Sequence, residues 1–321
     1  MWACLFAWSG KTGYMTFRQN LPRIFFSKIG NQQLRTAIWT GVDKGFGKRT
    51  PLLFFNGIGA NLEIAQLFAD TFTGRDIITF DMPGVGGSPD PSFPYRPWWV
   101  AKAAKQIMEE NGYHRCDVLG VSWGGGPAQQ FAWQNKRMTR RLILCATSPG
   151  WTMVPGNPKA LSKMASPKRY IDRDFLKKNF ETLYGDTVDH AGEFSVNMMP
   201  PSVKGYLFQL AAMMGWSSIP IARRVRARTL IIMGDADHIV PPINGRLLDF
   251  LYRRSRLEIL EGAGHLFLLT RREETVEIIR DFFGEPEMPI PHVEPEEVPS
   301  VKASFVHAND RQPVPVVRAN P

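Results

Sequence analysis

Short apolar runs alternate with helix-length segments along most of this chain. The runs are rich in β-branched and aromatic residues, and they read RIFFSKI, QLRTAIWT, PLLFF, DIITF, CDVLGV, RLILCAT, TLIIMG and LEIL. Strands that alternate with helices favour a mostly parallel sheet with helices on both faces. The first two runs leave no room for a helix between them, so they predict a hairpin at one edge. The pattern therefore predicts an α/β fold.

The chain is long enough for one large domain, and its two ends differ from the rest. It has 321 residues, of which 44% are hydrophobic, and this suffices for a substantial core. We expect the domain to span residues 20–284, after an N-terminal extension at 1–19. Residues 285–321 hold eight prolines and show no apolar periodicity, which predicts a mobile, Pro-rich tail.

A long insertion interrupts the alternation of strands and helices. About eighty residues between RLILCAT and TLIIMG hold six of the thirteen methionines, together with many aromatic residues. We interpret the segment at about 150–222 as an inserted helical cap. Most of its apolar residues are expected to be ordinary core, but flexible methionines adapt to varied ligands. The candidates for lining an apolar substrate cleft are Trp151, Met153, Met213 and Trp216.

Composition argues against several classes of protein. No stretch reaches the roughly 18 uninterrupted apolar residues of a membrane span, and the first residues lack the basic leader of an export signal. The three cysteines, Cys4, Cys116 and Cys145, have no metal-ligand spacing and fit a reducing cytoplasm. The formal charge is +9; we interpret the basic surface as solvated and expect no nucleic-acid partner.

The run CDVLGV ends in a Gly-x-Ser-x-Gly pattern and passes at once into a helical segment, SWGGGPAQQFA. A strand that turns this tightly into a helix strains the serine backbone, and only glycines fit its crowded flanks. The turn exposes the serine hydroxyl at the carboxyl edge of the sheet, where ligands bind in open α/β folds. Gly120, Ser122 and Gly124 therefore predict a nucleophile elbow.

An acid and a histidine follow in the order that such a site requires. The loop after TLIIM offers Asp235 and Asp237, and the loop after LEIL offers His265. One helix and one strand fill the residues between Asp237 and His265, so both side chains return to the same edge of the sheet. We favour Asp237 as the acid because it lies further past the strand end, while the alternative, Asp235, more plausibly caps the loop.

Backbone amides complete the expected site. An oxyanion hole takes its N–H groups from the residue after the nucleophile and from the loop after PLLFF, here NGIGAN. These amides belong to Trp123 and Ile58. We expect His265 to take the Ser122 proton and return it to the leaving alcohol, while Asp237 holds the imidazole tautomer. The pattern predicts ester hydrolysis through an acyl-enzyme, with no metal and no cofactor.

A second glycine-rich stretch, DMPGVGGS at 81–88, invites comparison with a phosphate-binding loop. It lacks the Gly-Lys-Ser/Thr ending and the complete dinucleotide fingerprint of such loops. We expect instead a turn that shapes the mouth of the site.

Several stretches resemble one family in particular. LLFFNGIGANLE, FDMPGVGGS, VLGVSWGGGPAQQFA, MASPKRY, MMGWSSI and GHLFLLTR are similar to segments of the intracellular depolymerases of medium-chain-length polyhydroxyalkanoates, members of the α/β-hydrolase superfamily. The resemblance runs from about residue 20 to 284 and implies a triad of Ser122, Asp237 and His265. It also implies a cytoplasmic enzyme that acts at the surface of storage granules and releases 3-hydroxy acids.

The chain departs from this family in three features: the N-terminal extension, the acidic Pro-rich tail, and Pro127, which is tolerated so near a helix start. Polyester synthases carry cysteine at the elbow, so Ser122 argues for hydrolysis rather than polymerisation. A generic carboxylesterase or lipase that acts on small apolar esters is the leading alternative. A non-catalytic granule-associated protein with a vestigial site is another. The sequence predicts no particular oligomeric state.

Overall fold

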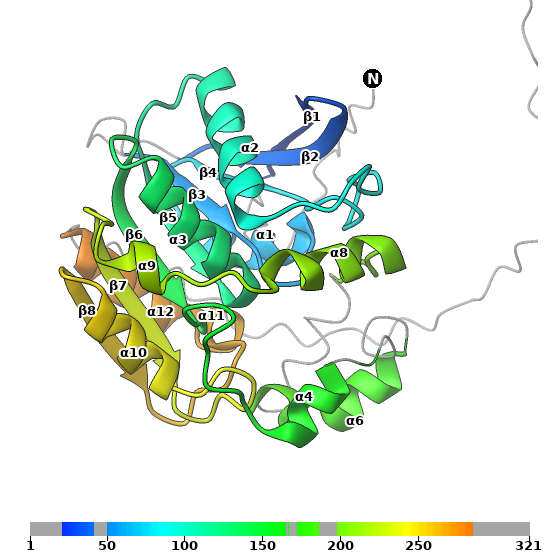
Figure 1. The fold of residues 1–321 in the computed structure, drawn as a ribbon, viewed down its shortest axis with the longest axis vertical. Helices are drawn as coiled ribbons and strands as arrows, with labels where there is room; N and C mark the ends of the chain where they lie inside the picture. The colour runs from blue at the N-terminus through cyan, green and yellow to red at the C-terminus, as the bar shows by residue number, and fades with distance from the viewer. Residues whose placement is uncertain (1–20, 42–49, 165, 167–171, 186–197, 285–321) are drawn as a thin grey trace, which may run out of the picture. The chain divides into compact units, whose positions relative to one another are not determined.

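An eight-stranded sheet forms the centre of the computed structural model, which describes residues 21–41, 50–164, 166, 172–185 and 198–284 (Figure 1). The predicted extension at 1–19 and the predicted tail at 285–321 lie outside these residues. The strands lie in the order β1-β2-β4-β3-β5-β6-β7-β8. Their bounds are β1 Arg23–Ile29, β2 Gln32–Trp39, β3 Leu52–Phe55, β4 Ile77–Phe80, β5 Cys116–Val121, β6 Thr139–Cys145, β7 Arg228–Gly234 and β8 Ser255–Leu260.

The sheet is parallel except at one edge. β1 and β2 pair as an antiparallel hairpin, in which Arg23 lies opposite Ile38, and β2 is also antiparallel to β4. All the other neighbouring strands run parallel. Each of the eight apolar runs forms one of these strands, so the predicted mostly parallel sheet with an edge hairpin is confirmed.

Helices cover both faces of the sheet, because the strand side chains alternate between two separate cores. Leu53 and Phe55 of β3 point into one core, and Leu52 and Phe54 point into the other. The first core lies under α2 Pro97–Glu110, α3 Gly125–Gln134 and α10 Ile243–Leu251. The second lies under α1 Leu62–Thr71, α11 Phe267–Thr270 and α12 Arg272–Phe283 (Figure 1).

Helices also fill the described part of the segment between β6 and β7, where the sequence predicts an inserted cap. Asp172 caps α6 by accepting a hydrogen bond from the Phe175 amide, and Ser202 caps α8 through the Gly205 amide. We call the described residues between 150 and 222 the cap segment. Its helices are α4 Pro158–Met164, α6 Arg173–Tyr184, α8 Val203–Met213 and α9 Ile219–Ala222.

Two cysteines belong to the interior of the sheet. Cys116 on β5 and Cys145 on β6 are fully buried, and this burial raises the pKa of both thiols far above its usual range. The thiols therefore stay protonated and serve as small apolar core groups. Among the described helices, none combines the length and the apolar character needed to cross a bilayer.

Candidate active site

The segment after β5 turns through one strained residue. Ser122 has a φ of +54°, in the left-handed region that costs an L-residue about 1–2 kcal/mol. A single 3₁₀ turn, Ser122–Gly124, leads directly into α3. The Thr147 hydroxyl donates a hydrogen bond of 2.7 Å to the Ser122 carbonyl and supports this conformation. Pro127 is the third residue of α3, where an amide has no acceptor within the helix, so the proline costs no hydrogen bond.

Two glycines allow the backbones to meet this closely. A Cβ on Gly120 would lie 2.6 Å from the Cβ of Ala128 in α3. A Cβ on Gly124 would collide with the carbonyl oxygens of Phe55 and Asn56, at the end of β3. Any larger residue at either position would push α3 away from the sheet and displace the serine.

Ser122, His265 and Asp237 form a continuous chain of hydrogen bonds. The His265 Nε2 lies 2.9 Å from the Ser122 Oγ, and its Nδ1 lies 2.7 Å from the Asp237 Oδ2. His265 and Asp237 are both about 96% buried, each being 4% exposed. Because the carboxylate only accepts, Nδ1 carries the proton, and Nε2 is left to accept from the serine hydroxyl.

The acid loop after β7 separates the two candidate carboxylates. The amides of Ile239 and Val240 donate to the Asp237 Oδ1 at 2.8 and 2.9 Å, which leaves Oδ2 directed at His265. Asp235 is exposed and accepts from the Gly262 amide at 2.7 Å, so it joins this loop to the one after β8. The structure thus brings Asp237, and not Asp235, to the imidazole.

The two amides expected in an oxyanion hole lie in turns beside the serine. Residues 57–60 form a turn closed by the Ala60 amide and the Gly57 carbonyl at 3.2 Å, and Ile58 in this turn lines the pocket next to Ser122. Trp123 lies in the first turn after β5, where backbone N–H groups have no acceptor within a helix. Both positions suit the stabilisation of an oxyanion next to the serine hydroxyl.

An apolar pocket opens at the serine. It holds about 650 Å³ of space not filled by atoms, part of it open to solvent. Ile64 and Phe68, one turn apart on the inner face of α1, form one wall, and Leu268 and Leu269 of α11 form another. The cap segment contributes Met164, one of the six methionines that the sequence places in the cap, and Tyr184, which the sequence analysis did not single out. Such a mostly apolar lining suits an alkyl chain better than a polar group.

The four cap residues predicted to line a cleft lie outside the described lining of this pocket. Trp151 is 65% exposed, and Met153 packs against the first core. Trp216 lies against Gly126 of α3 together with Met213, and its indole donates to the Gln130 side chain at 2.8 Å. The Met213 and Trp216 side chains thus attach the cap segment to α3. A role in the cleft for all four residues stays a prediction.

The end of α6 packs against the loops that carry the acid and the histidine. The His265 amide donates to the Tyr184 carbonyl at 2.5 Å, and the two rings stack with centroids 6.5 Å apart. Gly185 continues from α6 with a φ of +75° and passes so close to Ala236 that a Cβ would strike its carbonyl oxygen. The cap segment therefore helps to set the position of the imidazole.

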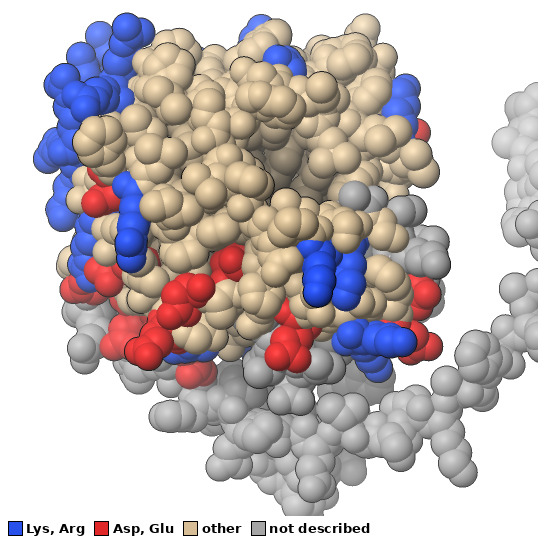
Figure 2. All heavy atoms as spheres, turned by 60° about the horizontal axis from the view of Figure 1, so that its bottom comes forward, with Lys and Arg blue, Asp and Glu red and all other residues tan. Residues whose placement is uncertain are grey.

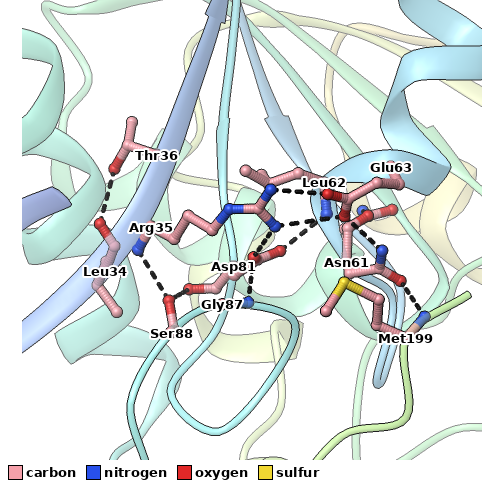
Figure 3. Close-up of polar contacts among 11 residues, drawn as sticks. Leu34, Arg35, Thr36, Asn61, Leu62, Glu63, Asp81, Gly87, Ser88 and Met199 are labelled. Carbon is pink, nitrogen blue, oxygen red and sulfur yellow. Dashed lines mark hydrogen bonds and ion pairs between the residues drawn. The ribbon is translucent and has the colours of Figure 1, made fainter. Parts of the chain in front are cut away.

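Asp81, at the end of β4, connects the glycine-rich turn to the start of α1 (Figure 3). Its carboxylate accepts from the Gly87 amide at 3.0 Å, from the Leu62 amide at 2.8 Å and from Arg35 at 3.2 Å. Burial raises the pKa of Asp81 to about 6, although these donors act in the opposite direction. Nearby, the Asn61 Oδ1 accepts from the Met199 amide of the cap segment at 3.0 Å.

The sequence of this chain is similar to those of known hydrolases. The family model described as the alpha/beta hydrolase fold matches residues 50–271. A poly(3-hydroxyalkanoate) depolymerase from Ectopseudomonas oleovorans is 40% identical over 81% of this chain and 93% of that protein. A pimeloyl-[acyl-carrier protein] methyl ester esterase from Aeromonas hydrophila is 26% identical over 74% of this chain and 97% of its own.

Solved structures show the same fold at lower identity. An esterase from Exiguobacterium antarcticum is similar with a TM-score of 0.67 and 20% identity, covering 79% of this chain and 96% of that one. A bromoperoxidase from Bacillus anthracis is similar with a TM-score of 0.68 and 18% identity, covering 82% and 100%. Within the described residues, no group of three or more His, Cys, Asp and Glu side chains is arranged to hold a metal ion.

The raised pKa of Asp81 leads to a prediction of how the stability of the fold depends on pH. The pKa of Asp81 is about 6 in the folded chain and about 4 in an unfolded one, so folding favours its protonated form. The free energy of unfolding that Asp81 contributes is greatest below pH 4. It falls by about 3 kcal/mol as the pH rises from 4 through 6. Urea denaturation should show the stability of wild type relative to Asp81→Asn declining from pH 4 to pH 7. A relative stability that rises over this range would show that Arg35 and the two amides outweigh burial.

The backbone strain at Ser122 leads to a second prediction, about the stabilities of two variants. Glycine adopts a φ of +54° without a Cβ penalty, whereas alanine keeps that penalty, and both substitutions remove the hydroxyl. Ser122→Gly should therefore exceed Ser122→Ala in free energy of unfolding by about 1 kcal/mol, after allowance for the greater freedom of unfolded glycine. Parallel urea titrations of the two variants measure this difference. Equal stabilities, or a more stable alanine variant, would show that the elbow stores no such strain.

Proposed function

The chain belongs to the α/β-hydrolase fold family, and from this we propose that it is a serine hydrolase that cleaves the ester bonds of a poly(3-hydroxyalkanoate). The observation that carries the proposal is the chain of hydrogen bonds from Asp237 through His265 to Ser122, at the opening of an apolar pocket. The relative at 40% identity supports the choice of polymer.

The proposed reaction proceeds through an acyl-enzyme. The Ser122 Oγ attacks the ester carbonyl carbon while the His265 Nε2 takes its proton, and the amides of Ile58 and Trp123 stabilise the resulting oxyanion. The intermediate collapses when the C–O bond to the alcohol breaks and His265 returns the proton to the departing oxygen. Water then attacks the acyl-enzyme with His265 again as base, and this releases a 3-hydroxy acid and the free serine.

The pocket supports a substrate with an alkyl side chain of several carbons. Its walls at Ile64, Phe68, Leu268 and Leu269 present hydrocarbon to any group bound beside Ser122. Each methylene buried there contributes about 0.8 kcal/mol, so a five-carbon side chain gains several kcal/mol over a methyl group. The gain accelerates the reaction if the pocket holds the chain through the transition state. We infer a preference for medium-chain 3-hydroxyacyl units.

The outer face of α8 supports approach to an insoluble polymer. Its inner side, at Gly205, Gln209 and Ala212, is buried. Its outer side carries Val203, Leu207 and Leu210 at helical spacing, and Met214 follows directly after the helix; these four apolar residues are between 46% and 77% exposed. On the side of the molecule that carries α4 and α6, neutral residues cover a broad area around a hollow (Figure 2). Such a surface suits contact with a neutral polyester, and we propose that it holds the protein on storage granules in the cytoplasm.

A carboxylesterase that acts on small apolar esters is the second candidate. The similarity to a methyl ester esterase and the limited size of the pocket favour it. Both candidates share the same chemistry, and they differ in whether a polymer chain reaches Ser122.

A comparison of the two carboxylates tests the chemistry. In Asp237→Asn the amide nitrogen faces the His265 Nδ1, which stabilises the tautomer whose Nε2 carries a proton and cannot accept one from the serine. We expect kcat on p-nitrophenyl octanoate to fall by about 10³- to 10⁴-fold. Asp235→Asn is the matched control, because its remaining oxygen still accepts from the Gly262 amide, and it should change kcat less than about threefold. The reverse order of damage would assign the acid to Asp235.

The polymer itself tests the substrate. The purified protein should release 3-hydroxyoctanoic acid from an emulsion of poly(3-hydroxyoctanoate) at least about tenfold faster than it hydrolyses poly(3-hydroxybutyrate). Ser122→Ala serves as the control and should be inactive on both emulsions and on soluble esters. Hydrolysis of soluble esters alone would support the carboxylesterase. An inactive wild type that also resists labelling by a serine-directed phosphonate would support the non-catalytic granule protein.

A further inference from the structure

Gln209 is a fully buried polar residue on α8 that forms hydrogen bonds with two loops of the candidate active site. Its side-chain Oε1 accepts a hydrogen bond of 2.9 Å from the Gly59 amide, in the turn that carries Ile58. Its backbone carbonyl accepts a hydrogen bond of 2.8 Å from the indole of Trp123. One residue of the cap segment thus joins both segments that are placed to supply the oxyanion hole.

The turn at 57–60 needs a partner from outside. The Ala60 amide closes it onto the Gly57 carbonyl, and Gly59 at the third position has a φ of +67°, while Ile58 is absent from the residues with positive φ. This combination defines a type II turn, in which the central N–H, here that of Gly59, points away from the turn and finds no acceptor within it. The Gln209 Oε1 supplies that acceptor and fixes the plane of the Ile58–Gly59 peptide.

This turn lies directly against the serine. A Cβ on Gly57 would lie 3.7 Å from the Ser122 Cβ, so a small shift of the turn changes the distance from the Ile58 amide to the reacting oxygen. α8 itself has little freedom to move, because a Cβ on Gly205 would lie 2.6 Å from the Cα of Gly84 in the glycine-rich turn. The hydrogen bond from Gly59 therefore ties the turn to a fixed support.

The NH2 group of the Gln209 side chain, in contrast, holds no part of the site. Its Nε2 is buried and has no hydrogen-bond partner among the residues that the structure describes, and its identity is certain because the Gly59 amide can donate only to an oxygen. A buried unpaired donor costs about 1–3 kcal/mol, a cost that a methionine of similar length would not carry. Packing alone would therefore favour a hydrocarbon at this position.

We infer that Gln209 is a positioning residue of the oxyanion hole, which holds the Ile58 turn through its side chain and Trp123 through its carbonyl. The inference rests on the proposed serine-hydrolase function. Gln209 acts on the developing oxyanion through these two segments and makes no contact with the substrate itself. It should therefore affect the transition state and leave the binding of the ester in its ground state unchanged.

The test compares Gln209→Met with wild type on p-nitrophenyl octanoate and with a trifluoromethyl ketone that bears an octyl chain. The ketone accepts the Ser122 Oγ at its carbonyl carbon, the serine proton passes to His265, and the ketone oxygen becomes an oxyanion. We expect kcat to fall about 10- to 100-fold with KM within twofold, and the inhibition constant of the ketone to rise by the same factor. Should Gln209→Met fail to fold, Trp123→Phe removes the indole donor, together with part of the ring, and kcat and the inhibition constant should each worsen about three- to tenfold.

Gln129→Met is the matched control. Gln129 is also fully buried; it donates to the Ser148 carbonyl, and its oxygen lies 3.2 Å from the Tyr252 hydroxyl, away from the turn at 57–60. This variant should lower the melting temperature and leave kcat and the inhibition constant within twofold of wild type. The inference is overturned if Gln209→Met matches wild type in kcat and in the inhibition constant of the ketone. It is also overturned if Gln129→Met changes these two constants as much as Gln209→Met does. A wild type that neither cleaves the ester nor binds the ketone would instead overturn the proposed function.

Discussion

The close contact between α3 and the ends of β3 and β5 is the constraint on which the rest of the site depends. Glycine at 120 and 124 lets the helix begin where a side chain would strike Ala128 or the carbonyls at the end of β3. The chain then passes through Ser122 at a φ of +54°, and this exposes the hydroxyl while the first turn of amides follows directly behind it. The strain is local, and the two cores packed against opposite faces of the sheet hold it in place.

The cap segment contributes directly to the candidate active site. The Tyr184 carbonyl accepts a hydrogen bond from the His265 amide, and the Met199 amide donates one to the Asn61 side chain. Gln209 accepts one from the Gly59 amide and one from the Trp123 indole. Together these contacts reach three loops at the carboxyl edge of the sheet, those that follow β3, β5 and β8. Because the loops come from separate strands, the cap segment joins groups that the sheet alone would position independently. The pocket wall at Met164 and Tyr184 shows that the same segment also shapes the space next to the serine.

Much of the fold and the core of the site follow from the sequence. The eight apolar runs became eight strands, because short runs rich in β-branched and aromatic residues favour strands. The order of Ser122, an acid and His265 at successive strand ends predicts that they meet, because parallel strands present their carboxyl ends at one edge. The sequence analysis favoured Asp237 over Asp235, and the structure brings Asp237 to the imidazole. That choice depended on distance past the strand end, a property that is local to the chain.

The contacts that the cap segment makes with the loops of the sheet also join parts far apart in the chain, and the sequence analysis did not find them. Nothing in the pattern around Gln209 shows that its amide meets Gly59, 150 residues away, and a buried glutamine on an apolar helix has no spacing signal. The cleft candidates Trp151, Met153, Met213 and Trp216 were chosen by composition, whereas the helical part of the pocket lining at the serine came from α1, α11 and the ends of α4 and α6. The strands, the elbow and the chain order of the candidate triad could be predicted from the sequence alone, because each follows from periodicity or from a local motif. The side chains that surround the serine could not, because they depend on how α1, α11 and the cap segment pack around the carboxyl edge of the sheet.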